Sequence, residues 1–196
     1  MYVNDKQYEN ASLCLQEAHS RLQDNIVLRF KEWVQVSTLL VFCHCKSDKL
    51  HEAEQLVTSM ANDIAELQSY GKAHERAQTI CDLGNSVIHN LLVKNSLEAA
   101  ERLAIKIIEM GEQNGILASE TERSLAEIYR RQGKFAEALE HCNKTMLPEN
   151  GAETRPTGEE TEREGKILLA FIYFTAGDMK KYVVGEAYLS DHHKGK

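Results

Sequence analysis

The sequence predicts an all-α protein, and two observations carry this prediction. Apolar residues recur with the 3.6-residue period of a helix, whereas the alternation of branched and aromatic residues that marks strands is not found. Only two prolines and eleven glycines occur in 196 residues, while residues that lose little rotamer freedom in a helix recur throughout. We therefore expect helices joined by short connections.

The helix expected at 49–69 shows this pattern most clearly. Its apolar residues have the spacing of one buried face, and its opposite face is polar. The apolar residues are Ala53, Leu56, Val57, Met60, Ala61 and Ile64. Ser47 or Asp48 is expected to cap the start of this helix, and Gly71 lies just past its end.

The same pattern predicts nine helices along the chain. Their expected ranges are 5–22, 25–46, 49–69, 72–93, 96–113, 117–132, 135–147, 159–176 and 178–190. The gaps between them are short, which makes successive helices antiparallel neighbours. We expect a single helical domain over residues 1–190, with a mobile loop at 148–160 and a disordered tail at 191–196.

One segment, residues 125–139, carries the most informative pattern. A large residue and a small one precede an aromatic residue, a glycine turn, a second aromatic residue and a second small one. These residues are Leu125, Ala126, Tyr129, Gly133, Phe135 and Ala138. Their order resembles the tetratricopeptide repeat (TPR) family. The alanines would let two paired helices approach closely, and the aromatic rings would fill the space beside the turn.

Weaker copies of the pattern occur at 40–53, 87–100 and 169–182, with a half-copy at 5–11. The equivalent positions are Ala11, Ala53, Ala100, Ala138 and Tyr182, and they are 38–47 residues apart. The standard repeat has roughly 34 residues, so the chain is similar to a long-helix variant of the family. The resemblance implies a right-handed α-solenoid with an N-terminal half-repeat and four helix pairs. Related helical-pair repeats stay open as an alternative.

Charge and composition narrow the classes of partner. The net charge is -7 and the basic residues are interleaved with acids, which argues against nucleic acid as a partner. The longest apolar run, residues 167–174, is too short to cross a bilayer, so we expect no membrane insertion. Five scattered cysteines and an N-terminus without a secretory pattern predict an intracellular protein, in the cytoplasm or alternatively in the nucleus.

The segment Cys43-His44-Cys45, with His51 nearby, is the most metal-like cluster. Structural zinc sites usually space their cysteines two to four residues apart in turns, whereas such close neighbours on a helix point apart. Buried or half-buried thiols are therefore the favoured interpretation. Acidic residues at 159–164 are typical of a solvated helix start. The sequence predicts no catalytic residues, no metal and no cofactor.

The TPR resemblance implies a concave groove lined by the first helix of each pair, where a peptide of a partner protein lies. In this register the inward positions are Asn85, His89, Arg123, Glu127 and Arg130. The alternative is a solvent-facing stripe in which Arg123 and Glu127 form an ordinary i,i+4 pair. Gly84-Asn85 matches part of the pattern that captures acidic chaperone tails, but Ile80 and Cys81 stand where that pattern needs a lysine.

The function implied by this resemblance is that of a non-catalytic scaffold or adaptor that binds a peptide segment of another protein. Two alternatives stay open. One is a sensor of small molecules or peptides that uses the same groove, with Phe171 and Phe174 in its pocket. The other is an enzyme whose site the sequence does not reveal.

The N-terminal half-repeat has a further implication. Its helix lacks the preceding helix that would pair with it, and Tyr8, Leu13, Leu15 and Leu22 place apolar groups on more than one side. Solenoid ends need a polar cap, and monomers seldom expose large apolar patches. We therefore expect this end to associate with a second copy or to continue into preceding repeats of a longer protein.

Overall fold

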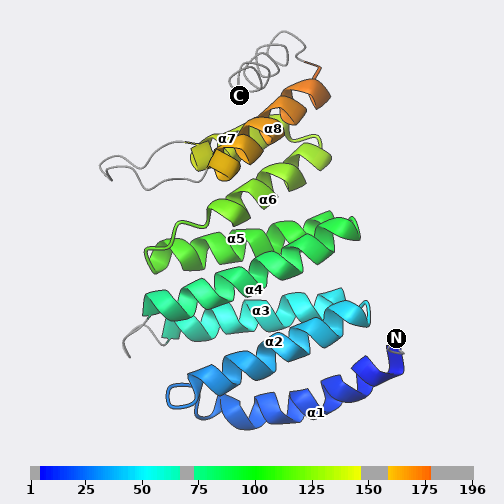
Figure 1. Ribbon diagram of the computed structural model, residues 1–196, viewed down its shortest axis with the longest axis vertical. Coiled ribbons are helices and arrows are strands. Elements are labelled where there is room, and N and C mark those ends of the chain that lie inside the picture. The colour runs from blue at the N-terminus through cyan, green and yellow to red at the C-terminus, as the bar shows by residue number, and fades with distance from the viewer. Residues whose placement is uncertain (1–4, 67–72, 147–158, 178–196) are drawn as a thin grey trace. The chain divides into compact units, whose positions relative to one another are not determined.

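The structure is a computed structural model that describes residues 5–66, 73–146 and 159–177. These residues form eight helices and no strand (Figure 1), which confirms the all-α class. The helices are α1 (Asp5–Gln23), α2 (Phe30–Lys46), α3 (Leu50–Glu66), α4 (Ala73–Val93), α5 (Leu97–Gln113), α6 (Ser119–Arg131), α7 (Phe135–Met146) and α8 (Glu159–Thr175).

The described residues thus hold eight helices rather than the expected nine. The ninth, at 178–190, lies outside the described residues, as does the tail at 191–196. Most of the loop expected at 148–160 also lies outside them, and its last two residues, Glu159 and Glu160, already belong to α8.

The start of α2 differs from the expected position at residue 25. Residues 25–29 form a turn in which the amides of Leu28 and Arg29 donate to the carbonyl of Asn25 at 3.1 and 3.0 Å. The helix begins only at Phe30. The apolar residues Ile26 to Leu28 continue the helical pattern into the turn, so hydrophobic periodicity alone places the boundary too early.

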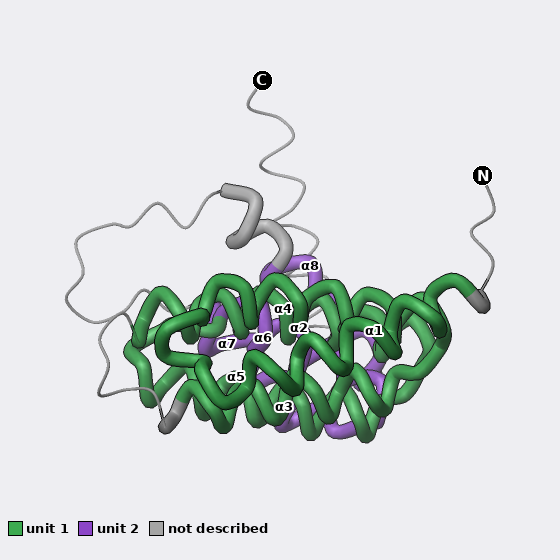
Figure 2. The backbone as a smooth tube through the Cα atoms, turned by 90° about the horizontal axis from the view of Figure 1, so that it is seen from below, with its two compact units in different colours: residues 1–118 green, residues 119–196 purple. Residues whose placement is uncertain are grey.

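Two compact units can be distinguished, residues 1–118 and residues 119–196 (Figure 2). The first holds α1 to α5, and the second holds α6 to α8. Each unit has buried apolar residues of its own. The single repeat domain expected over residues 1–190 stays a prediction.

In the first unit each helix packs against the next along the chain (Figure 1). Helix α3 also packs against α5. The apolar stripe expected on α3 is buried except for Leu56, which is half-buried, and Ala53, Val57 and Met60 are fully buried. Trp33 of α2 is also fully buried, and its indole Nε1 donates to the Gln23 amide oxygen at 3.0 Å. The core of this unit therefore runs between successive helices.

The turns between paired helices share one backbone conformation. Asp48, Asn95 and Gly133 have positive φ angles of 57°, 58° and 77°. In each turn the next amide donates to a carbonyl five residues earlier, at 2.8, 2.9 and 2.9 Å. This left-handed ending satisfies the last carbonyls of a helix and suits Gly, Asn and Asp.

These turns occupy equivalent places in the sequence pattern. The alanines expected to be equivalent, Ala53, Ala100 and Ala138, each lie five residues after the left-handed residue and are fully buried. Three consecutive helix pairs, α2–α3, α4–α5 and α6–α7, therefore share one turn and one small buried contact residue. The fold is repeat-like in this sense.

The expected capping role of Ser47 and Asp48 at the start of α3 is wrong. Ser47 ends α2, with its amide donating to the Cys43 carbonyl at 3.0 Å, and Asp48 takes the left-handed position. Asp48 also forms an ion pair with Lys94 at 3.0 Å. The polar residues in this turn thus close the preceding helix.

The second unit is built around small residues. Ala126, Ala138, Cys142 and Ile172 form its buried centre, and Tyr129 and Phe135 are among the rings packed against them. The two alanines are fully buried, as expected for close helix contacts. Helices α6, α7 and α8 all contact one another within this unit.

Candidate functional site

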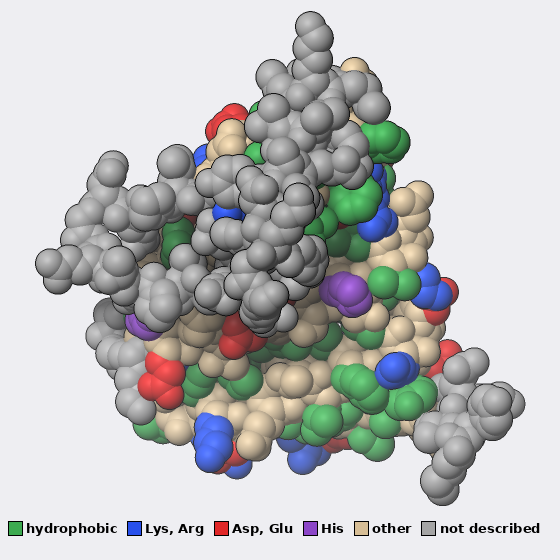
Figure 3. Space-filling model, turned by 45° about the horizontal axis from the view of Figure 1, so that its top comes forward, with side chains coloured by type: hydrophobic (Ala, Val, Ile, Leu, Met, Phe, Trp, Pro, Cys, Tyr) green, Lys and Arg blue, Asp and Glu red, His purple; other side chains and the backbone are tan. Residues whose placement is uncertain are grey.

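The expected groove residues of the first unit lie on α4. His89 is exposed, and Asn85, one turn earlier, is half-buried. Both residues therefore lie on the solvent-accessible face of this helix. The same face carries Gln78, whose amide donates to the Asp82 carboxylate at 2.9 Å. This face of α4 is polar and solvent-accessible. On the side of the molecule seen in Figure 3, histidine, basic and acidic side chains are interspersed with apolar ones.

The other three expected residues lie on α6, in the second unit, and two of them are in contact. The Arg130 guanidinium donates two hydrogen bonds to the Glu127 carboxylate, at 2.7 and 2.8 Å. Arg131 donates a third, at 2.7 Å. Arg123 is half-buried on the same helix. The ionic cluster of Glu127, Arg130 and Arg131 lies within one helix, and α4 and α6 belong to different units.

The electrostatics of this cluster follow from its geometry. Partial burial on its own would raise the pKa of the Glu127 carboxyl, but the hydrogen bonds from Arg130 and Arg131 outweigh it and lower the pKa below its usual value. The pKa of Arg130 is raised by its hydrogen bonds to Glu127. Both groups are therefore charged at neutral pH.

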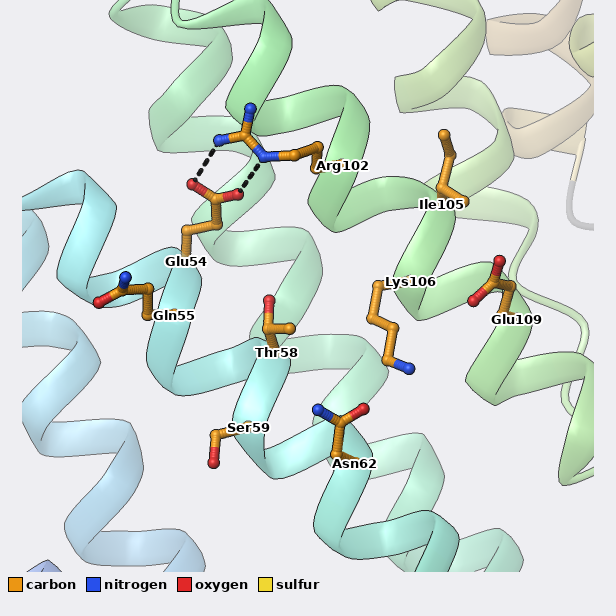
Figure 4. Close-up of a pocket in the computed structure, with 9 residues that line it drawn as sticks. All are labelled: Glu54, Gln55, Thr58, Ser59, Asn62, Arg102, Ile105, Lys106 and Glu109. Carbon is orange, nitrogen blue, oxygen red and sulfur yellow. Dashed lines mark hydrogen bonds and ion pairs between the residues drawn. The ribbon is translucent and has the colours of Figure 1, made fainter.

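A groove that the sequence did not reveal lies between α3 and α5, within the first unit (Figure 4). Its volume is about 530 Å³ and it is open to solvent. Gln55, Thr58, Ser59 and Asn62 line it from α3, and Arg102, Ile105, Lys106 and Glu109 line it from α5, together with Glu54. Most of these side chains can donate or accept hydrogen bonds.

One end of the groove is fixed by an ion pair between the two helices. The Arg102 Nε and one terminal nitrogen donate to the two Glu54 carboxylate oxygens at 3.0 and 3.1 Å. The Glu54 side chain is 8% exposed and that of Arg102 60%. His51 approaches the same carboxylate at 3.6 Å and shares a hydrogen bond with Gln55.

The middle and the far end of the groove differ from this fixed end. Lys106 extends from α5 toward Asn62 of α3 (Figure 4), and Thr58 lies near them on the α3 wall. Glu109 lies one turn further along α5 and is exposed. Ile105 adds an apolar side chain that is 38% exposed. The groove therefore combines hydrogen-bonding groups with apolar contact surface.

A sequence signal for this groove exists, although it is weak. Glu54 is an acid within the buried stripe of α3, between Ala53 and Val57, and a buried charge requires a partner. That partner, Arg102, follows 48 residues later. The repeat spacing of 47 residues between Ala53 and Ala100 aligns Glu54 with Glu101, next to Arg102. Nothing in the sequence, however, distinguishes Arg102 from other exposed cations.

The metal-like segment is placed in the interior of the first unit. Cys43 and His44 are buried, Cys45 is half-buried, and His51 is engaged by Glu54 and Gln55. Burial raises the pKa of both thiols and lowers the pKa of His44. No group of three or more His, Cys, Asp or Glu side chains suited to a metal ion was found in the described part of the chain.

Two further cysteines are also buried. Burial raises the pKa of Cys81 and of Cys142 to about 11, so both thiols are protonated at neutral pH and are poor nucleophiles. Phe171 and Phe174, expected to line a sensor pocket in one alternative, are exposed on α8. Within the described residues, no helix is long and apolar enough to span a bilayer.

The N-terminal helix α1 packs against α2. Leu22 is buried and Leu15 is half-buried, while Leu13 is 64% exposed. The ring of Tyr8 meets Phe42 of α2 edge-on, with centroids 5.9 Å apart. Association of this end with a second copy or with preceding repeats stays a prediction.

Comparison with known proteins supports the fold. No family model and no curated protein matches the chain. Among solved structures, BtubC (BKLC) from P. vanneervenii is similar, with a TM-score of 0.61 and 14% sequence identity over 97% of this chain and 76% of that chain. An identity this low shows a shared all-helical, repeat-like fold and nothing about activity.

Proposed function

We propose that this chain is a TPR-like solenoid that acts as a non-catalytic scaffold or adaptor and binds a peptide segment of another protein. The TPR assignment is supported by the shared turns at Asp48, Asn95 and Gly133 and by the buried alanines that follow each turn. In this assignment α2, α4, α6 and α8 are first helices, and α3, α5 and α7 are second helices.

The observation that carries the proposal is the open groove between α3 and α5. Its two walls belong to successive repeats, and its lining supplies amide, hydroxyl and charged groups. A chain of polar contacts of this kind suits an extended peptide, whose backbone offers donors and acceptors along its length. Small-molecule sites are typically enclosed, whereas this groove is open to solvent.

The groove lies on second helices, whereas the residues expected from the resemblance, such as His89 and Arg123, lie on first helices. The proposal therefore includes two separate surfaces in the first unit. One is the α3–α5 groove, and the other is the polar face of α4, with Asn85 and His89 as its contact residues. In the second unit, Arg123, Glu127 and Arg130 of α6 are the proposed contact residues.

Site-specific photo-crosslinking tests the proposal and separates the two surfaces. We would place p-benzoylphenylalanine at Ser59 in the groove, at His89 on α4, and at the exposed Glu137 of α7 as a control. We expect one recurring partner segment, identified by mass spectrometry, to be crosslinked at Ser59 or His89 and not at Glu137. The same background proteins at all three positions would contradict a peptide-binding scaffold.

A further inference from the structure

Of the two cations that line the α3–α5 groove, one has no ion pair within the described residues. Arg102 is held by Glu54 through two hydrogen bonds. Lys106, one turn further along α5, is half-buried and makes no ion pair or hydrogen bond within the described residues. A half-buried ammonium group gains from an opposite charge, because the groove walls exclude part of the water that would otherwise solvate it.

Apart from Glu54, which is already paired with Arg102, the opposite wall supplies no such charge among the described residues. The α3 residues that line the groove beyond Glu54 are all neutral and polar: Gln55, Thr58, Ser59 and Asn62. Thr58 and Asn62 can each donate a hydrogen bond toward the space near Lys106. Arg102 adds a second set of donors, since its Nη1 is not used in its contacts with Glu54. The middle of the groove is therefore rich in hydrogen-bond donors, which an anion could use as an acceptor.

We propose that the α3–α5 groove binds a carboxylate side chain, aspartate or glutamate, of an extended peptide segment, with Lys106 as its charged partner. This inference rests on the proposed peptide-binding function. An ionised carboxylate only accepts hydrogen bonds, so it matches a lysine flanked by neutral donors.

The dimensions of the groove favour a peptide over a free anion. From Glu54 to Asn62 the helix α3 rises by about 12 Å, which equals the length of roughly four residues of extended chain. Ile105, on the same wall as Lys106, offers a contact for an aliphatic side chain next to the acid. Glu109 lies at the far end and disfavours a second acid there.

Binding of two peptide pools to the full, ¹⁵N-labelled chain tests the inference. Both pools are random tetrapeptides, acetylated and amidated at their ends. One has Glu fixed at the second position, and the matched pool has Gln there. We expect the Glu pool to shift the backbone amide signals of residues 55–62 and 102–109. Its affinity is expected to be about tenfold higher than that of the Gln pool, because one charge-assisted hydrogen bond contributes a difference of this size.

Two variants and a control assign the effect to Lys106. Lys106→Met keeps the aliphatic stem and is expected to remove the preference for Glu, while Lys106→Arg keeps it. Lys31→Met, at an exposed position of α2, is expected to leave the preference unchanged. Thermal denaturation of each variant shows whether the fold is retained. A preference for Glu that survives in a folded Lys106→Met would overturn the inference.

The remaining outcomes separate this inference from the proposed function. Equal shifts from both pools at the groove would overturn the carboxylate assignment and leave peptide binding in place. No groove shifts, with shifts on α4 around His89 instead, would overturn the inference and move peptide binding to the other surface. Equal shifts from inorganic phosphate alone at the same concentration would show a simple anion site and overturn the peptide assignment.

Discussion

Arg102 of α5 and Glu54 of α3 join two helices that are not consecutive in the chain. The guanidinium donates two nearly equal hydrogen bonds, of 3.0 and 3.1 Å, to the two oxygens of one carboxylate. A bidentate pair of this kind fixes the orientation of both side chains as well as their distance. The pair joins a buried Glu54 to a mostly exposed Arg102 and links the two groove walls at one end.

Removing this arginine is expected to cost more stability than removing an arginine from a fully exposed pair. Arg102→Met leaves the buried Glu54 carboxylate without its bidentate partner, whereas Arg21→Met breaks an exposed pair with Glu17 inside α1. We expect a larger fall in Tm for Arg102→Met, measured by circular dichroism.

A second substitution provides the control for this prediction. Adding Glu54→Gln to Arg102→Met removes the uncompensated charge and is expected to recover part of the lost stability. If Arg102→Met and Arg21→Met lower Tm equally, or if the double variant is no more stable than Arg102→Met alone, the pair does not link the helices as described.

The sequence predicts the helices well because their apolar stripes are local features. On α3 the apolar residues between Ala53 and Ile64 follow the helical period, and the structure buries all of them except Leu56, which is half-buried. The repeat register is predicted for a similar reason, since the turn and the small residue that follows it are only five positions apart, as at Gly133 and Ala138. Both signals lie within one helix pair.

The groove could not be predicted, because it depends on which distant helices touch. Glu54 and Arg102 lie 48 residues apart, and their contact requires α3 to pack against α5. The expected site residues follow from the alignment of the chain with the TPR pattern. Of these residues, Asn85 lies on α4 and Arg130 on α6. The TPR pattern assigns no binding residues to the surface between the second helices α3 and α5. The sequence therefore did not predict Lys106 and Thr58 as groove residues.

The cluster around Glu127 predicts a pH dependence of stability. The hydrogen bonds from Arg130 and Arg131 hold the folded-state pKa of Glu127 below its unfolded value. A depressed carboxyl pKa contributes stability that is present above the unfolded pKa and is lost as the pH falls through the folded pKa. Glu127→Gln is expected to cost about 1 kcal/mol at neutral pH, since the cluster is partly screened by solvent.

Urea denaturation at pH 7 and at pH 3 measures this contribution. The difference between wild type and Glu127→Gln is expected to shrink at the lower pH, where the unfolded carboxyl is protonated. Glu137→Gln, at an exposed acid on α7, serves as the matched control and is expected to show a smaller difference at both pH values. A gap between wild type and Glu127→Gln that stays constant with pH would contradict the assigned role.

The small residues of the second unit are expected to be sensitive to added volume. Ala138 is fully buried against Ala126, Cys142 and Ile172, so Ala138→Leu must displace packed side chains. Overpacking of this kind costs about 1–3 kcal/mol, which thermal denaturation detects. Ala136→Leu adds the same volume two residues earlier, at an exposed position, and is expected to leave Tm nearly unchanged. Equal effects at both positions would place Ala138 outside the helix interface.

The last prediction concerns the close approach of α4 and α5 at Gly84. A Cβ atom at this position would lie 2.7 Å from both Cγ1 and Cδ1 of Ile107, a fully buried side chain. Gly84→Ala gains roughly 1 kcal/mol of helix propensity, but overpacking costs about 1–3 kcal/mol. Because Cγ1 cannot move without the rest of the isoleucine, we expect the steric cost to prevail, with a net loss of about 1 kcal/mol.

A double-mutant cycle separates these two contributions. Ile107→Val removes Cδ1 and is expected to cost about 0.5–1.5 kcal/mol alone but less in the Gly84→Ala background, since it relieves part of the clash. Ile128→Val, at a fully buried isoleucine of the second unit, is expected to be additive with Gly84→Ala. If Ile107→Val and Ile128→Val are equally additive with Gly84→Ala, Gly84 is not required for the close approach of α4 to α5.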